Sequence, residues 1–340
     1  MRRVLIVRLR SIGDTVLATP TLIALRRFLP DAQIDILLED WVAPLLNGHD
    51  SIDNVISVGR GSIERLATAR KIRKSKYDVV VNLHGGTTAT FFVGASGARH
   101  RIGYAELQYS FIYNHLLSSA NDFWQQKTTH SAEQQLALLG FVGVPVEDRP
   151  KSRLSVTPQQ ADEMDQFLHL HGIDEEKIAL IHPATAFETK RWPAKNFART
   201  IEYLKALGFL PIVVTTPQEK HIFDEITAST ETFFHGFSDL DLPQIVALAA
   251  RSAIFVGNDS GIAHLAAAVQ TPSVVVFGSS NRNHWRPWTD APNEIVFEEF
   301  ACQPCPGYVC AEFGEPKCIL SVAPSSVFTA LGRILATPKI

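Results

Sequence analysis

One stretch of the chain combines residue types that can hold a phosphate group. Residues 255–264 read as a buried strand that runs through a small-residue turn into a helix. Asp259 or Ser260 can cap this helix, and Gly261 lets a ligand approach the backbone. His264 falls within about the first turn and can point back to the same place. The free N–H groups and positive dipole end of the helix suit a phosphate, although a capped turn without a ligand is the alternative.

A second candidate segment, residues 182–193, follows a predicted strand at 178–181. It offers the hydroxyls of Thr185 and Thr189 and the adjacent cations Lys190 and Arg191, just before a helix that begins with a proline. Lys and Arg are the usual partners of phosphate oxygens. The alternative is a surface loop with solvated charges.

Near the N-terminus, residues 8–14 lie between a strand and a helix. Neither the P-loop pattern nor the dinucleotide-binding glycine fingerprint is present in them. The segment offers one carboxylate, that of Asp14, at the start of the helix. A lone Asp at such a position is most often only a helix cap.

A fourth segment follows the strand predicted at 79–83. His84 is followed by Gly85 and Gly86, which permit a close approach to the backbone. Residues 97–104 are then expected to form a compact basic turn that could hold an anionic acceptor. A solvated charged loop is the alternative.

The four cysteines of the chain all lie in one C-terminal segment with the spacing C-x2-C-x4-C-x7-C: Cys302, Cys305, Cys310 and Cys318. Four thiolates are the right number for a structural zinc site. The spacing is not that of a zinc ribbon, in which two close pairs are well separated. A reduced structural loop is therefore favoured over zinc or an iron–sulfur cluster, and no sequence argument connects the segment to the candidate chemistry.

The elements that must position these segments alternate between strand and helix. Strands are predicted at 4–7, 34–38, 55–58, 79–83, 178–181, 211–214, 253–256 and 273–277, and helices at 16–28, 42–46, 62–75, 161–171, 196–207, 242–250 and 262–269. This alternation predicts an α/β fold with parallel sheets, in which ligands bind at the carboxyl ends of the strands. The polar segment 147–153 is predicted to link two domains, 1–150 and 151–340.

The composition of the 340 residues, 46% hydrophobic and 20% charged, is that of a soluble globular protein. A net charge of −3 gives no global basic field, so no nucleic-acid partner is expected. The apolar run at 4–7 is too short for a signal peptide, and no run is long enough to span a bilayer. A cytoplasmic protein is expected, which can still touch a membrane surface.

Taken together, the motifs resemble those of glycosyltransferase family 9, the ADP-heptose:lipopolysaccharide heptosyltransferases. The four matching pieces are Arg10-Ser11-Ile12-Gly13-Asp14; Asn82-Leu83-His84-Gly85-Gly86 with Arg101-Ile102-Gly103-Tyr104; His182-Pro183 with Lys190-Arg191-Trp192-Pro193; and Gly257-Asn258-Asp259-Ser260-Gly261 with His264. They occur in family order and cover most of the chain. Each is weak alone, but jointly they are specific.

The resemblance implies a GT-B fold, with two Rossmann-like doubly wound domains facing a central cleft. The N-terminal domain would hold the acceptor and the C-terminal domain the donor, and the last helix could pack back on the N-terminal domain. The implied reaction is an inverting transfer of heptose or a related sugar from an ADP-sugar, without a required metal. The implied acceptor is an anionic glycolipid, the lipopolysaccharide inner core, or another surface glycan, with peripheral contact to the inner membrane.

The resemblance also implies roles for individual residues. Asp14 matches the general base, and Lys190 matches the lysine that contacts the donor diphosphate. The remaining donor-side residues are Thr185, Asp259, Ser260, Gly261 and His264, and the acceptor-side residues are Arg10, Ser11, Gly13, His84 and Arg101. Two alternatives stay open, a nucleotide-sugar epimerase of the same architecture and a non-catalytic nucleotide-sugar-binding protein. The missing glycine fingerprint disfavours a dehydrogenase.

Overall fold

The computed structural model describes residues 3–174, 176–305 and 307–336 of the chain. The chain divides into two compact units, Met1–Ser155 and Val156–Ile340. The boundary lies after the predicted linker because the backbone of Arg153 is tied to the first unit. Its N–H donates to Thr19 Oγ1 at 3.0 Å, and its carbonyl oxygen lies 3.2 Å from His49 Nε2.

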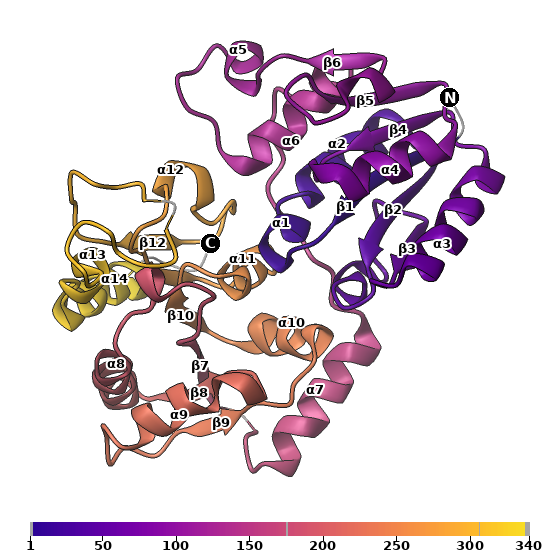
Figure 1. Ribbon diagram of the computed structural model, residues 1–340. Coiled ribbons are helices and arrows are strands. Elements are labelled where there is room, and N and C mark those ends of the chain that lie inside the picture. The colour runs from indigo at the N-terminus through magenta and orange to yellow at the C-terminus, as the bar shows by residue number, and fades with distance from the viewer. Residues whose placement is uncertain (1–2, 175, 306, 337–340) are drawn as a thin grey trace. The chain divides into compact units, whose positions relative to one another are not determined.

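The first unit holds a parallel six-stranded sheet in the order β3-β2-β1-β4-β5-β6. Its strands are β1 (Arg3–Leu9), β2 (Gln33–Glu39), β3 (Asn54–Val58), β4 (Val79–Asn82), β5 (His100–Tyr104) and β6 (His115–Leu117). Its helices are α1 (Ile12–Val16), α2 (Thr19–Phe28), η1 (Ala43–Leu46), α3 (Ser62–Ser75), α4 (Gly86–Ser96), η2 (Ser110–Ile112), α5 (Ala120–Trp124) and α6 (Ser131–Gly140). The pair α3 and α4 packs together, as does the pair α2 and α6 (Figure 1).

The second unit repeats this order as β12-β11-β10-β7-β8-β9, again with parallel strands. Its strands are β7 (Lys177–His182), β8 (Phe209–Val214), β9 (His235–Phe237), β10 (Ile254–Asn258), β11 (Ser273–Val276) and β12 (Asn293–Val296). Its helices are α7 (Pro158–Leu170), η3 (Glu188–Lys190), α8 (Ala194–Ala206), η4 (Pro217–Glu219), α9 (Lys220–Thr227), α10 (Leu242–Arg251), α11 (Gly261–Ala268), α12 (Arg282–Trp285), α13 (Lys317–Leu320) and α14 (Pro324–Ala336).

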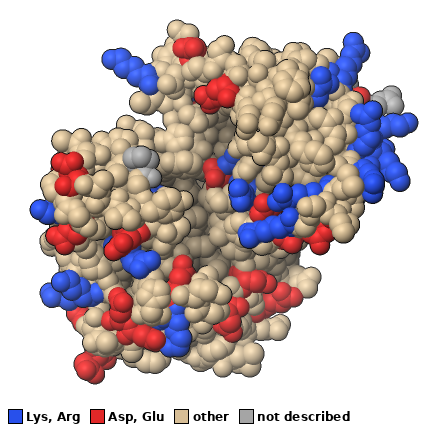
Figure 2. Space-filling view, in the orientation of Figure 1, with Lys and Arg blue, Asp and Glu red and all other residues tan. Residues whose placement is uncertain are grey.

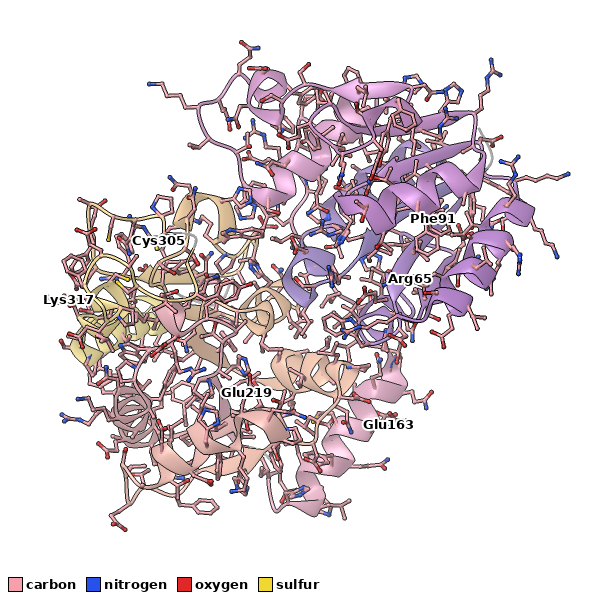
Figure 3. All side chains as sticks on the ribbon, in the orientation of Figure 1. Arg65, Phe91, Glu163, Glu219, Cys305 and Lys317 are labelled. Atoms are coloured by element: carbon pink, nitrogen blue, oxygen red, sulfur yellow. The ribbon has the colours of Figure 1, made fainter. Side chains whose placement is uncertain are left out.

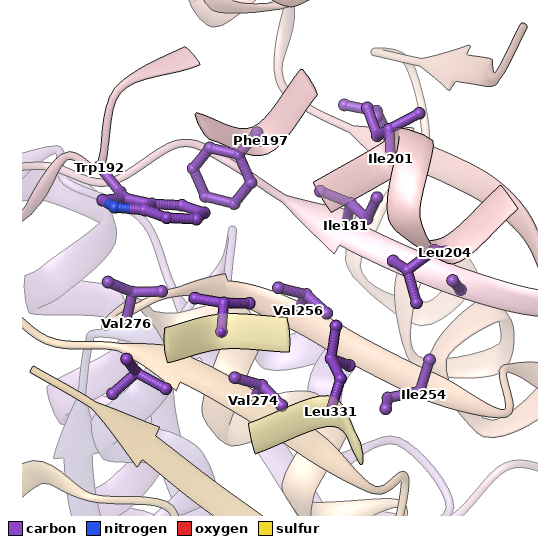
Figure 4. Close-up of a cluster of buried hydrophobic side chains, with 14 of the residues drawn as sticks. Ile181, Trp192, Phe197, Ile201, Leu204, Ile254, Val256, Val274, Val276 and Leu331 are labelled. Atoms are coloured by element: carbon purple, nitrogen blue, oxygen red, sulfur yellow. The ribbon is translucent and has the colours of Figure 1, made fainter. Parts of the chain in front are cut away.

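Each unit has its own hydrophobic core between sheet and helices. In the second unit, Trp192 and Phe197 pack edge to face over strand residues such as Val276 (Figure 4). The apolar face of α14 belongs to this core, since Leu331 is buried in it and the helix packs on β11, β12 and α8. This apolar face is therefore used within the second unit, and packing of the last helix on the N-terminal domain stays a prediction.

Two local predictions were wrong. The helix predicted at 16–28 is broken between α1 and α2, because Pro20 has no N–H to donate to the carbonyl of Val16. The hydroxyl of Thr19 donates to that carbonyl instead, at 2.8 Å. The basic turn predicted at 97–104 is mostly the strand β5, which pairs with β4 on one side and β6 on the other.

None of the helices in the described part of the chain combines the length and apolar character needed to cross a membrane.

Candidate functional site

Both sheets place the candidate segments at their topological switch points. The strand order reverses between β1 and β4 in the first unit and between β7 and β10 in the second. Loops that leave the carboxyl ends of such neighbouring strands diverge and open a crevice, where α/β proteins bind ligands. Residues 10–14 and 84–86 follow β1 and β4, whereas residues 183–193 and 259–264 follow β7 and β10.

In the second unit, a lysine and an aspartate from different segments form an ion pair. Lys190 Nζ lies 2.9 Å from Asp259 Oδ2, and both side chains are largely buried. The same carboxylate oxygen accepts a 2.5 Å hydrogen bond from Ser280 Oγ, in the loop after β11. The ammonium group also lies 5.0 Å from the ring centre of Phe187. These contacts hold a cation beside the start of α11.

The start of α11 offers hydrogen-bond donors. Ser260 is the N-cap residue, but its side chain makes no capping bond. Its buried Oγ has no hydrogen-bond partner among the described residues. The first N–H groups of a helix lack partners within the helix, and Gly261 leaves them accessible. His264 lies one turn further along, with 5% of its surface exposed.

The loop that carries Lys190 is clamped at both ends by one buried asparagine. Asn258 Nδ2 donates to the carbonyl of Pro183 at 2.6 Å, and Asn258 Oδ1 accepts from the backbone N–H of Trp192 at 3.1 Å. Thr185 Oγ1 donates to the carbonyl of Asp259 at 3.3 Å. All six predicted donor-side residues are therefore brought to one place by β7, β10 and α11.

The middle of this loop is held by Thr189, which is almost fully buried. Its hydroxyl donates to the carbonyl of Gly307 at 3.0 Å and accepts from Ser279 Oγ at 2.8 Å. Its own carbonyl accepts from the N–H of Ser279 at 3.2 Å. The N–H of Cys305 in turn donates to the carbonyl of Ser279 at 2.8 Å. The cysteine-bearing segment, for which the sequence offered no connection, thus packs directly on the loop of Lys190.

The four cysteines are free thiols. Burial raises the pKa of the Cys318 thiol, and the neighbouring thiols of Cys302 and Cys310 raise it further. Within residues 3–174, 176–305 and 307–336, no group of three or more His, Cys, Asp or Glu side chains has the arrangement of a metal site. Figure 3 labels Cys305 in this segment.

In the first unit, the carboxylate of Asp14 is held by two side chains. One oxygen pairs with the buried guanidinium of Arg8, and the other accepts from Ser11 Oγ at 3.0 Å. Arg8 also donates to the carbonyl of Leu83, the residue after β4. Burial lowers the pKa of Arg8, an effect that the Asp14 charge opposes. Ser11, not Asp14, is the N-cap of α1, and Asp14 retains a side chain that is 25% exposed.

His84 adjoins this group. Burial, with the nearby charges of Arg8 and Arg10, lowers the pKa of His84 to about 4, so the imidazole is neutral near pH 7. A pocket of about 210 Å³ opens beside it, lined by Leu9, Arg10, Glu39, Arg65, His84, Gly86, Thr87 and Thr88. Gly13 is buried within α1. Four of the residues predicted for the acceptor side thus gather around Asp14 and this pocket, namely Arg10, Ser11, Gly13 and His84.

Arg101 is not brought to this place. It lies near the beginning of β5, away from the carboxyl end of the strand. Its guanidinium donates to the carbonyl of Ile112 at 2.5 Å and to that of Ala98 at 2.6 Å. These bonds give Arg101 a structural role, since they fix the chain on either side of β5.

Sequence reasoning missed several residues that complete the two groups. Arg8 was read only as part of a loop, and Thr189 only as a hydroxyl near the two cations. The roles of Asn258 and Ser280 were not foreseen. Asn258 and Thr189 bond to residues that lie between 66 and 118 positions away in the sequence, so no local pattern predicts these contacts. The one usable signal was Arg8, a cation that directly follows the apolar residues 4–7 of β1.

The sequence signature of "Glycosyltransferase family 9 (heptosyltransferase)" matches residues 65–314. Lipopolysaccharide heptosyltransferase 3 of Escherichia coli (strain K12) is 27% identical, over 96% of each chain.

Solved structures share this fold. The family 9 glycosyltransferase of Veillonella parvula superposes with a TM-score of 0.84 at 19% identity, covering 98% of this chain and 97% of that one. Escherichia coli ADP-heptose lps heptosyltransferase II gives a TM-score of 0.82 at 21% identity, covering 98% of both. The two α/β units are thus the Rossmann-like domains of a GT-B fold. With the signature spanning most of its length, the chain belongs to glycosyltransferase family 9, the heptosyltransferases.

Proposed function

We propose that this protein transfers a heptose from ADP-heptose to the core of lipopolysaccharide, with inversion at the anomeric carbon. Its family membership and the names of its relatives support this activity. The observation that carries the proposal is the ion pair of Lys190 and Asp259 at the start of α11. A cation beside unpaired helix N–H groups is suited to a nucleotide diphosphate.

On the donor side, the diphosphate oxygens bind Lys190, Ser260 Oγ and the first N–H groups of α11. As the bond to the sugar breaks, the leaving diphosphate gains negative charge. Lys190, Ser260 and the helix N–H groups then bind the diphosphate more strongly in the transition state than in the ground state. Such a difference in binding is what accelerates the transfer reaction. These groups supply the charge stabilisation that a divalent cation gives in other transferases, so we propose that no metal ion is required.

On the acceptor side, Asp14 takes the proton from the attacking hydroxyl group. Its carboxylate is oriented by Arg8 and Ser11 but keeps an exposed portion of side chain that a sugar can reach. Neutral His84 can hydrogen-bond a sugar hydroxyl from the adjacent pocket. Arg10 and Arg65 give that pocket cations suited to an anionic inner-core acceptor.

The lipid anchor of such an acceptor lies in a membrane. We therefore also propose that the protein works as a peripheral protein at the cytoplasmic face of the inner membrane.

A thermal-shift screen of nucleotide sugars tests the donor. ADP-heptose should raise the unfolding temperature, because a ligand that binds the native state stabilises it, whereas UDP- and GDP-sugars should not. A larger shift with a UDP- or GDP-sugar would contradict the donor assignment.

A transfer assay tests the reaction. ADP should be released only when a heptose-deficient core acceptor is added, and the product should carry the anomeric configuration opposite to that of the donor. Conversion of donor to a new sugar without acceptor would instead indicate an epimerase. Donor binding without ADP release would indicate a binding protein.

A further inference from the structure

Helix α3 in the first unit concentrates positive charge on the surface. Arg70, Lys71 and Lys74 are exposed on it, Arg65 and Arg73 belong to the same helix, and Glu64 is its only acidic residue. The whole chain has a net charge of −3, so this excess is local. Figure 2 shows Lys and Arg gathered on the part of the first unit where Figure 1 draws α3.

Large apolar side chains are exposed on α3 and on the elements packed beside it. Ile63 and Leu66 lie in the first turns of α3, and Ile63 is 86% exposed. Phe91 is exposed on α4, which packs against α3 (Figure 3). Tyr109 and Phe111 are exposed around η2, and Phe111 is 81% exposed.

η2 is itself packed on α4, where the Ile112 side chain comes within 3.5 Å of the position that a Cβ on Gly94 would occupy. The α3–α4 surface is thus defined by Ile63, Leu66, Arg70, Lys71, Lys74, Phe91, Tyr109 and Phe111.

The α3–α4 surface borders the pocket beside His84. Arg65 of α3 lines that pocket, as do Gly86, Thr87 and Thr88 at the beginning of α4. An acceptor whose sugar enters the pocket would therefore emerge next to the two helices. If the acceptor is a glycolipid, as the proposed function holds, its lipid anchor is directed to this surface.

We propose that the α3–α4 surface docks the protein on an anionic phospholipid bilayer. Exposed apolar side chains enter the headgroup region, and Lys and Arg beside them are attracted by anionic headgroups. A protein partner is disfavoured because charged residues are depleted from the centres of protein interfaces. A nucleic acid could bind the cations, but its binding would not explain why Ile63 and Phe111 are exposed beside them.

Vesicle flotation tests this proposal with the full-length protein. The wild type should float with vesicles of phosphatidylglycerol and phosphatidylethanolamine, but not with phosphatidylcholine alone. The Arg70→Gln, Lys71→Gln, Lys74→Gln triple variant should lose at least about tenfold in affinity for the anionic vesicles. Arg73 is left intact because its guanidinium lies over Gly97.

A second variant tests the apolar side chains. Replacing Ile63 and Phe111 together with Ser leaves the charge unchanged and should also weaken vesicle binding.

A matched control removes the same charge elsewhere. Arg199→Gln, Lys205→Gln, Lys220→Gln changes three exposed cations of the second unit and should leave flotation unchanged. Equal losses in both triple variants, or wild-type flotation of the α3 variant, would overturn the proposal. Self-association of the wild type in the absence of vesicles would also overturn it, if the α3 substitutions abolished that association. The surface would then bind a second copy of the protein.

The proposed function is tested separately with a water-soluble acceptor fragment without acyl chains. The α3 triple variant should transfer sugar to this fragment at the wild-type rate. Loss of that activity would mean that the helix serves the chemistry and not docking. If the wild type floats with anionic vesicles but shows no transfer, the proposed function fails while the membrane surface stands.

Discussion

Asp14 is the residue on which the proposed chemistry depends. Replacing it with Asn keeps the side-chain shape but removes the proton acceptor, so kcat should fall by about 100-fold or more. The thermal shift produced by ADP should remain, because the groups proposed to bind the nucleotide lie in the other unit. Retention of near-full turnover by Asp14→Asn would refute the base assignment. The unfolding temperature must be measured as well, since Arg8 loses its carboxylate partner.

Thr189 is predicted to position Lys190 without touching the donor. Thr189→Val removes the hydroxyl that bonds Gly307 and Ser279 but keeps the side-chain volume. The donor KM should rise by roughly threefold to tenfold, with a smaller change in kcat, because a loosened Lys190 binds the diphosphate less well. Steady-state kinetics with varied ADP-heptose measures this split.

Two further variants separate positioning from general stability. Thr189→Ser keeps the hydroxyl and should restore the donor KM. Thr200→Val removes a comparably buried hydroxyl, one that donates to the carbonyl of Asn196 at 2.9 Å within α8. It should lower the unfolding temperature without altering the donor KM. If Thr200→Val raised the KM as much as Thr189→Val, the positioning role would be refuted.

His84 should make stability depend on pH. Its pKa is about 4 in the folded protein against an ordinary value of 6.5, so the unfolded chain binds more protons between these values. The free energy of unfolding should therefore fall as the pH drops from about 6.5 to about 4. Burial also lowers the pKa of His49 and His182, which act in the same direction. The His84→Gln variant isolates one contribution, and urea unfolding should show a shallower pH dependence than in the wild type.

At the scale of elements, the loop after β11 should limit where the Lys190 loop can lie. A Cβ added at Gly278 would lie 2.3 Å from the carbonyl oxygen of Thr189 and 3.0 Å from Ile319 Cβ. Gly278→Ala should therefore displace the loop, cost about 1–3 kcal/mol of stability and weaken ADP binding. Calorimetry with ADP measures the affinity.

Gly332 provides the contrast, since a Cβ there would meet nothing within 4 Å and the residue lies inside α14. Gly332→Ala should stabilise the protein by about 0.5–1 kcal/mol and leave ADP affinity unchanged. Unchanged ADP affinity in Gly278→Ala would show that this contact does not position the loop.

The strongly patterned elements were predictable. The helix predicted at 62–75 matches α3, and the strands predicted beside residues 8–14 and 257–264 are β1 and β10. The donor-side residues follow two strands of one sheet, so their convergence could be expected from the rule that ligands bind at carboxyl strand ends. The strand β5 was missed because it begins with the polar residues His100 and Arg101, which do not follow an apolar strand pattern. Its strand conformation is stabilised by pairing with β4 and β6.

At the scale of the whole molecule, nucleotide binding should be confined to the second unit. Hydrogen exchange measured with ADP alone should slow at the amides of residues 183–193 and 259–264. Exchange at residues 10–14 and 84–88 should stay the same, because that group is proposed to bind the acceptor. Protection of the first unit with none in the second would reverse the assignment of donor and acceptor.

The sequence by itself determined the α/β class, the two-domain organisation and the residues that follow β1, β4, β7 and β10. These follow from hydrophobic periodicity and from small, polar and charged residues at strand ends, which are local properties. Only the tertiary structure decided that Arg8 and Ser11 hold Asp14 and that Arg101 is used structurally. It also showed that the cysteine-bearing segment braces the Lys190 loop through Thr189. Such contacts join residues far apart in sequence, where no local pattern records which partner a side chain meets.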